Sequence, residues 1–386
     1  MSDSSAVYPH YFNDTHEQVR DTIRKFVAEH IDGHMRDWEE AGSFPRELYR
    51  LAGDAGILSI GYPEALGGIG EGDVFMQIAA SEEIMRAGSG GFAASLGSHD
   101  IALPPIAKWG TDDMKHRVVP EVLRGDKIAA LAITEPSGGS DVAGIKTRAV
   151  SDGDYYRVSG SKMFITSGIR ADYYTVAVRT GGDGYGGISL LLMEKGMAGF
   201  TTGKPLQKMG WWASDTAELF FDDVKVPKAN LIGAENMGFF AITTNFQMER
   251  IKLAVMANMT SQLALEECLR YVPERTAFGK PLAKMQLIRH KLADMATQID
   301  ASREYTYRIA ARIQAGIPSV KEVSMAKNFA TRTSDFVTYE ATQIFGGMGF
   351  MRESLVERLY RDNRILSIGG GTHEIMNEVI AKQLGL

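Results

Sequence analysis

Two short segments in the second half of the chain hold residue types from which acid–base chemistry could be built. NFQMER, at residues 245–250, places Glu249 directly before Arg250 near the start of a predicted long helix. Phe246, Glu249 and Arg250 stand at positions i, i+3 and i+4, so they share one helix face. A buried glutamate has a raised pKa that suits a general base, whereas an exposed one in a first turn only complements the helix dipole. IGGGT, at residues 368–372, offers no such side chain.

Residues 131–147, LAITEPSGGSDVAGIKT, contain the densest group of candidate binding residues. Pro136 and the pair Gly138–Gly139 interrupt regular structure and expose backbone N–H groups, and the threonine and serine hydroxyls add further donors. Such a loop suits the polar edge of a planar heterocycle or a phosphate. The alternative is an ordinary glycine-rich turn between a helix and a sheet.

The elements that must position these residues fall into three blocks, which together predict an α+β multidomain fold. Residues 1–128 have mainly helical periodicity and predict an N-terminal helical domain. Residues 129–238 contain short β-branched and aromatic runs separated by Gly, Asp and Ser, and predict a middle β domain. Residues 239–386 return to helical periodicity, with one long helix expected over residues 283–315.

Composition and charge exclude several classes of protein. The 386 residues carry a formal net charge of −6, which argues against a general nucleic-acid surface. The one cysteine, Cys268, lies in a helical pattern and predicts a buried thiol in a reducing compartment. His99 and His373 lack metal-ligand spacing, so no metal site is expected. No apolar run has the length of a membrane span, and the N-terminus lacks signal or transit features, so we expect a cytoplasmic protein.

Seven motifs along almost the whole chain resemble those of the acyl-CoA dehydrogenase family. AITEPSGGSDVAGIKT is similar to the signature loop of that family. The other motifs follow in the family's order: FITSG (164–168), KMGWWASDT (208–216), FFDDVKVP (220–227), RTAFGKPLAKMQ (275–286), QIFGGMGF (343–350) and GTHEI (371–375).

The resemblance implies a fold, a reaction and partners. The fold is an N-terminal helical domain, a barrel-like middle β-sheet domain and a C-terminal four-helix bundle. The reaction removes an α-proton and a β-hydride from an acyl-CoA thioester, gives a trans-2-enoyl-CoA, and transfers the hydride to N5 of FAD. Electrons then pass to an electron-transfer flavoprotein. A homotetramer is typical of the family, with each flavin also contacted by a neighbouring subunit.

The resemblance also implies which positions bind the cofactor and substrate. FAD-binding positions are Leu131, Ile133, Thr134, Gly139, Ser140, Phe164, Thr166, Arg275, Phe278, Gln286, Gln343, Gly346, Gly347, Thr372 and Glu374. Among these, the three from the 275–286 motif belong to the FAD of a neighbouring subunit. Substrate-binding positions are Ser140, Phe246 and Arg250. Phe164 stands where the family often has tryptophan, and Ala277 replaces a threonine seen in some relatives, which puts one hydroxyl contact in doubt.

The base position distinguishes branches of the family. Many members carry the catalytic glutamate in a YEGT-like string before the last helix, where this chain has Gly369-Gly370-Gly371-Thr372. The isovaleryl-CoA and long-chain branches carry it on the earlier helix, directly before an arginine, as in MER at residues 248–250. The resemblance therefore assigns the base to Glu249, and a backbone N–H of Glu374 or its immediate neighbour to the thioester oxygen.

This base position is typical of relatives that take long or branched acyl chains, and the expected substrate is a medium-length, long or branched acyl-CoA. Alternatives on the same fold are an acyl-CoA oxidase, a flavin monooxygenase, or a non-catalytic binding subunit. A monooxygenase needs no carboxylate base, so Glu249 counts against it, as it does against a non-catalytic role. Oxidase activity depends on oxygen access, which the sequence does not indicate.

Overall fold

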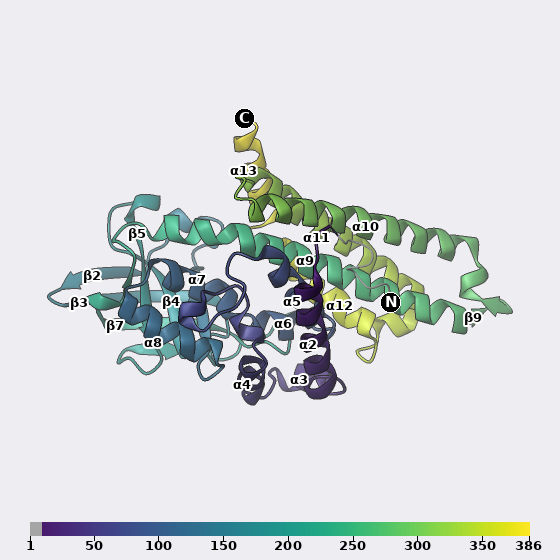
Figure 1. The fold of residues 1–386 in the computed structure, drawn as a ribbon, viewed down its shortest axis with the longest axis horizontal. Helices are drawn as coiled ribbons and strands as arrows, with labels where there is room; N and C mark the ends of the chain where they lie inside the picture. Colours follow the sequence, from purple (N-terminus) through teal and green to yellow (C-terminus); the bar gives the residue numbers. More distant parts are fainter. Residues whose placement is uncertain (1–9) are drawn as a thin grey trace.

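The computed structural model describes residues 10–386, which form a helical layer, a β layer and a bundle of long helices (Figure 1). This is the predicted order of helices, strands and helices. The N-terminal helices pack beside the sheet and the bundle. They are α2 (Asp14–His30), α3 (Met35–Ala41), α4 (Glu47–Asp54), α5 (Val74–Met85), α6 (Gly90–Leu96), α7 (His99–Trp109) and α8 (Asp112–Leu123).

The middle layer is an eight-stranded sheet with the order β6-β7-β3-β2-β4-β5-β8, and β1 pairs in parallel with β4. The strands are β1 (Ala129–Ala132), β2 (Arg148–Asp152), β3 (Tyr155–Thr166), β4 (Tyr173–Arg179), β5 (Ile188–Glu194), β6 (Phe200–Thr202), β7 (Thr216–Pro227) and β8 (Leu231–Ile232). The long β3–β7 ladder shifts register twice, between Val158 and Gly160 and between Lys162 and Ile165. Such irregularities bend a strand and re-aim its side chains, which matters here because Phe164 lies inside the second one.

The C-terminal helices α9 (Gly238–Glu274), α10 (Gln286–Gln314) and α11 (Val320–Phe345) pack along one another, and α12 (Leu355–Asn363) and α13 (His373–Gln383) pack against α11. The long helix expected over residues 283–315 is α10. A short ribbon, β9 (Thr276–Ala277) with β10 (Lys280–Pro281), joins α9 to α10 at the end of the bundle away from the sheet (Figure 1).

Glycine at the start of α9 lets that helix approach the sheet closely. A Cβ on Gly238 would lie 2.6 Å from the carbonyl carbon of Ser189 on β5, which is closer than side-chain atoms approach backbone. The helix therefore begins in contact with β5 and then runs into the bundle. Its first turns, which carry residues 246–250, are in this way held at the junction of sheet and bundle.

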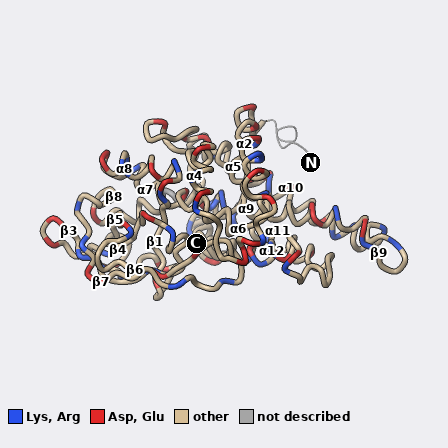
Figure 2. Tube along the Cα trace, turned by 90° about the horizontal axis from the view of Figure 1, so that it is seen from below, with Lys and Arg blue, Asp and Glu red and all other residues tan. Residues whose placement is uncertain are grey.

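Charged residues of both signs are interspersed along the molecule, as the tube in Figure 2 shows. The fold positions its elements mainly by apolar packing. Separate buried clusters lie under the sheet and within the bundle, for example around Tyr174 and Val176 in the sheet and around Met295 and Ile299 in the bundle.

Candidate active site

Glu249 lies on α9 in surroundings that suit a general base. The side chain is partly buried, and among the described residues its buried Oε2 atom has no hydrogen-bond partner. Burial raises the pKa of Glu249 above its ordinary value, although the positive charges of Arg250 and Lys327 oppose that shift. An unpaired buried carboxylate is costly to a fold, which makes Glu249 a candidate for a functional role.

Gly370, in the 368–372 segment, lies against this carboxylate. Gly370 has a φ of +63°, and a Cβ at this position would lie 2.5 Å from Leu253 Cδ1 and 3.4 Å from Glu249 Oε1. The glycine that could not serve as a base is therefore the residue that leaves room for the glutamate on α9. The structure thus explains why glycine at position 370 occurs together with a glutamate at position 249.

Arg250 links the helix to the same loop. Its Nε donates to the Gly370 carbonyl oxygen at 3.2 Å, and its guanidinium carbon lies 5.2 Å from the centroid of the Phe246 ring. Burial lowers the pKa of Arg250, and the charge of Glu249 opposes that shift. Phe246, Glu249 and Arg250 therefore lie close together, as their spacing predicts.

Lys327, on α11, is a residue of this site that sequence reasoning missed. Its fully buried Nζ donates to the carbonyl oxygen of Gly369 at 2.6 Å and also to that of Gly371. Burial lowers the pKa of Lys327 to about 8; Arg250 lowers it further and Glu249 opposes the shift. A lysine among the small and apolar residues of SMAKNFA was the available signal, because a lysine is rarely buried without partners.

The predicted flavin loop and the base helix meet on a shared apolar cluster. Leu131 and Ile133, which lead into the loop, and Phe246, on α9, all pack against the buried group that includes Ala129, Ile188 and Ile242. Thr134 is next to the β3 bulge, because its carbonyl oxygen accepts from Met163 N at 2.8 Å. The fold therefore brings the loop, the bulge and the α9 start into one region.

A buried ion pair holds the loop of residues 131–147 in place, and sequence reasoning did not identify it. Lys162 Nζ donates to Glu135 Oε1 at 2.9 Å and to the Ile133 carbonyl oxygen at 3.0 Å. The Glu135 carboxylate also accepts from the backbone N–H groups of Lys146, at 2.6 Å, and Thr147, at 2.9 Å. Burial opposes ionisation of Glu135, but Lys162 and these donors outweigh it and hold its pKa below the ordinary value.

Phe164 and Thr166 lie at the end of β3. Phe164 has a φ of +61° and is 60% exposed, an unusual combination for an aromatic residue in a strand. Thr166 is partly buried and pairs with Thr216 at the start of β7. The bulge thus turns the Phe164 ring out of the core and makes it available to a ligand.

The end of the predicted loop is open to solvent. Gly139 and Ser140 are exposed, and within the described chain their backbone N–H groups donate no backbone hydrogen bond. These are donors of the kind that bind acceptor atoms of a cofactor or substrate.

Six of the predicted cofactor positions lie on the C-terminal helices or their connections, away from β3 within one chain. Arg275 precedes the β9–β10 ribbon, Phe278 lies in its turn and Gln286 begins α10, at the end of the bundle away from the sheet (Figure 1). All three residues are exposed. Gln343, Gly346 and Gly347 are also exposed, at the C-terminal end of α11. One chain therefore does not bring these residues to Phe164.

Thr372 and Glu374 begin α13. Thr372 is the N-cap, and its hydroxyl accepts from Ile375 N at 3.3 Å. The Glu374 side chain is exposed, and its own backbone N–H together with the Thr372 hydroxyl lowers the pKa of its carboxyl. Since the Glu374 N–H already interacts with its own carboxylate, the expected thioester contact from this residue stays a prediction.

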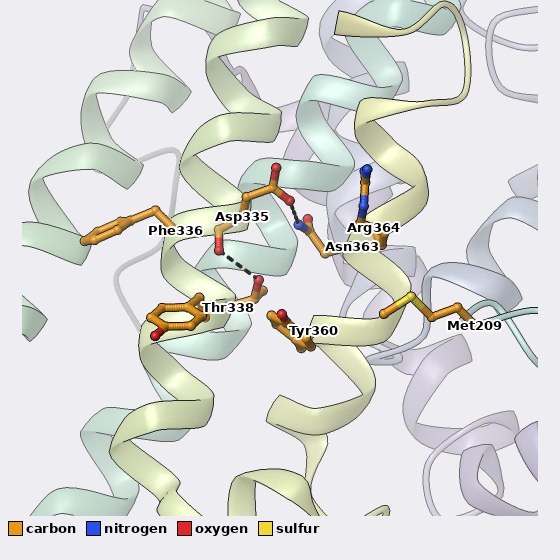
Figure 3. Close-up of a pocket in the computed structure, with 8 residues that line it drawn as sticks. Met209, Asp335, Phe336, Thr338, Tyr360, Asn363 and Arg364 are labelled. Carbon is orange, nitrogen blue, oxygen red and sulfur yellow. Dashed lines mark hydrogen bonds between the residues drawn. The ribbon is translucent and has the colours of Figure 1, made fainter.

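A groove of about 490 Å³ lies between α11, α12 and the segment before β7, outside the predicted site (Figure 3). Asp335 and Asn363 meet across it through a 2.6 Å hydrogen bond from the Asn363 amide. Met209, Tyr339 and Tyr360 add apolar surface. None of the residues that line the groove belongs to the sequence-predicted set.

Two kinds of feature are absent from the part of the chain that the structure describes. Between residues 10 and 386, no group of three or more His, Cys, Asp and Glu side chains is arranged to hold a metal ion. Across the same residues, no helix combines the length and apolarity needed to cross a membrane.

Comparison with known proteins covers nearly the whole chain. Models for the N-terminal, middle and C-terminal domains of acyl-CoA dehydrogenase match residues 13–126, 130–224 and 236–385. The long-chain specific acyl-CoA dehydrogenase of Sus scrofa mitochondria is 39% identical over 376 residues, 97% of this chain and 87% of that protein.

Solved structures agree with this match. A structure described as a probable acyl-CoA dehydrogenase of Mycobacterium abscessus is 50% identical, with a TM-score of 0.95 over 97% of this chain and 100% of that one. An acyl-CoA dehydrogenase of Bacillus anthracis, complexed with FAD, is 31% identical, with a TM-score of 0.91 over 97% of this chain and 68% of that one. The chain belongs to the acyl-CoA dehydrogenase family of FAD-dependent oxidoreductases.

Proposed function

We propose that Glu249 is the base that removes the α-proton of an acyl-CoA, in an α,β-dehydrogenation that yields a trans-2-enoyl-CoA. The observation that carries this assignment is the carboxylate of Glu249: its buried Oε2 atom has no partner among the described residues, and its Oε1 atom would lie 3.4 Å from a Cβ on Gly370. A raised pKa makes Glu249 a stronger base than a free carboxylate once it is ionised. The 368–372 segment contains no carboxylate that could compete with Glu249 for the role.

The residues present fit FAD. The exposed Phe164 ring offers an apolar surface for a flat heterocycle, and the unpaired N–H groups of Gly139 and Ser140 offer donors for its polar edge. Leu131, Ile133, Thr134 and Thr166 complete the proposed surface. When bound, FAD supplies the acceptor for the β-hydride.

The glycine loop supplies donors for the thioester oxygen. A trans peptide points its N–H opposite to its C=O. Because the carbonyls of Gly369, Gly370 and Gly371 face Lys327 and Arg250, the N–H groups that follow them face the other way. Within the described chain they donate no backbone hydrogen bond. This placement favours the loop over Glu374 as the donor that stabilises the developing enolate.

The proposed substrate has a medium-length, long or branched acyl chain, with electrons passing to an electron-transfer flavoprotein. The base on α9 and the likeness to a relative named as long-chain specific support this substrate class. Rates measured across acyl-CoAs of increasing length test it, and a maximum at four carbons would contradict it.

A homotetramer is proposed because one chain leaves part of its cofactor set far from the sheet. Phe278 is 97% exposed and has a φ of +49°, a strained and solvated position for an aromatic residue. Contact with the FAD of a neighbouring copy would give Phe278, Arg275 and Gln286 a ligand. Sedimentation of the purified protein tests the assembly state, and a monomer that retains FAD and full activity would contradict the proposal.

Glu249→Gln tests the base. The amide keeps the size of the side chain but cannot accept the α-proton at a useful rate, so FAD content should stay normal while acyl-CoA-dependent bleaching falls at least ~10³-fold. Glu274→Gln, at the exposed end of the same helix, is the matched control and should retain activity. Bleaching by the Glu249 variant at the wild-type rate would rule out this base.

The acyl-CoA oxidase alternative is tested by the electron acceptor. Turnover that reduces an artificial dye or an electron-transfer flavoprotein, with slow oxygen uptake, is expected of a dehydrogenase. Oxygen consumption that matches turnover would make the protein an oxidase.

A further inference from the structure

Lys327 is a buried cation near Glu249. Proton removal by Glu249 does not itself require this cation. It lies on α11, its side chain is fully buried, and it donates to two carbonyl oxygens of the triglycine segment, those of Gly369 and Gly371. A buried ammonium group is costly unless its donors are satisfied. At Lys327 the fold bears this cost beside the loop that contacts Glu249.

Arg250 and Lys327 together engage three successive carbonyls. Arg250 takes that of Gly370, between the two that Lys327 takes. Glycine has no side chain to anchor it and is free in φ, so a run of three has little conformational preference of its own. The two cations therefore decide the orientation of the peptide planes in this segment.

We propose that Lys327 is a positioning residue for dehydrogenation, which holds the 369–371 loop so that its N–H groups face the substrate and which keeps a positive charge behind the carboxylate of Glu249. The proposal rests on the function assigned to Glu249 above. Lys327 contacts the loop and acts through it.

The charges that face Glu249 come from two elements. Arg250 is on its own helix and Lys327 is on α11, and both favour the ionised carboxylate. The 368–372 loop contributes no charged side chain. Lys327 itself faces Arg250 and Glu249, and His373 at the start of α13 senses its charge. Loss of Lys327 therefore removes one of the two cations that stabilise ionised Glu249.

The test compares Lys327→Met and Lys327→Gln with Asn328→Ala. Asn328 is the adjacent buried residue, and its side-chain amide donates to the His373 carbonyl oxygen and to Asn377 on α13. Its loss should loosen α13, but the carbonyls of Gly369 and Gly371 keep their hydrogen bonds to Lys327. Two readouts are made on each holoenzyme. One is amide hydrogen exchange at Gly369, whose N–H donates to the Ile365 carbonyl oxygen at 2.8 Å, and the other is the pH profile of kcat/KM.

Both lysine variants should exchange the Gly369 amide faster than wild type, because its carbonyl is no longer held by Lys327, and should lose about tenfold or more in kcat. The acid limb of the pH profile should move up by about 0.5–1 unit, because Glu249 loses a stabilising cation. The Asn328 variant should change neither the limb nor the exchange of the loop.

Wild-type exchange of the Gly369 amide in the lysine variants would overturn the proposal, and so would an unmoved acid limb. The exchange readout does not depend on turnover, so it stands even for a variant that binds FAD poorly. Failure of the base assignment is recognised separately, because it is decided by turnover in Glu249→Gln with Lys327 intact.

Discussion

Gly370 shows at the scale of one residue how the site is built around the absence of a side chain. Its φ of +63° belongs to the left-handed region, and a Cβ there would meet Leu253 and approach the Glu249 carboxylate. Only glycine satisfies both conditions without strain. A side chain at position 370 would therefore occupy the space that Leu253 and the Glu249 carboxylate fill.

Gly370→Ala should cost about 1 kcal/mol through backbone strain, plus the cost of displacing Leu253. The matched control is Gly33→Ala, because Gly33 has a φ of +86° and a Cβ added there would have no heavy atom within 4 Å. Thermal unfolding should show the larger loss for Gly370→Ala. Its kcat should also fall, while that of Gly33→Ala should not. Equal effects of the two substitutions would contradict the packing argument.

The Glu135–Lys162 pair acts at the scale of an element, because it ties the loop after β1 to β3. Lys162→Met leaves the Glu135 carboxylate buried with only its backbone donors, and removal of one partner of a buried pair typically costs about 3–5 kcal/mol. We expect a lower melting temperature and weaker retention of FAD. The double variant Glu135→Gln/Lys162→Met, which removes both charges, should recover part of the loss. A double variant worse than the single one would contradict the pairing.

The Glu135–Lys162 pair also makes the stability of the folded protein depend on pH. Since the folded pKa of Glu135 lies below its unfolded value, its contribution to stability is present above the unfolded pKa of about 4.3 and is lost as the pH falls through the folded value. Acid should therefore loosen the loop, whereas neutral pH should leave it in place.

At the scale of the whole molecule, Asp362 joins three separate parts of the chain. Its carboxylate, on α12, accepts from Gly90 N at 2.9 Å, at the start of α6, and from Trp211 N at 2.6 Å, in the segment before β7. Burial raises the pKa of Asp362 to about 7, and the nearby Glu39 adds to the shift. The three layers are thus held together by a carboxyl group that the fold prefers to keep protonated.

Protonation of Asp362 makes the stability of the protein depend on pH in a defined direction. Between an unfolded pKa of about 3.9 and the folded value of about 7, the folded protein binds a proton that the unfolded chain releases, so this group lowers stability as the pH rises across that window. Asp362→Asn should flatten the dependence of the melting temperature between pH 5 and 7. The exposed Asp300→Asn is the control and should leave it unchanged. If the melting temperature of the Asp362 variant changed with pH as steeply as that of the wild type, this account would be contradicted.

Much of the architecture followed from local patterns in the sequence. Helical and strand periodicities predicted the order of the layers, and seven motifs in order indicated the family and the cofactor, because these signals are carried by neighbouring residues. The face shared by Phe246, Glu249 and Arg250 also followed from helical spacing alone. The FAD-contact roles and the domain boundaries at residues 128 and 238 stay predictions.

Only the tertiary structure identified the residues that support these groups. Lys327 lies 78 positions from Glu249 in the sequence, and Lys162 lies 27 from Glu135, so no local pattern connects them. Their roles arise because burial raises the cost of an unpaired charge, and the fold satisfies each cation with a distant carbonyl or carboxylate. The sequence by itself determined which residue could be the base; contacts between distant segments decided what surrounds it, since burial and charge depend on neighbours in space.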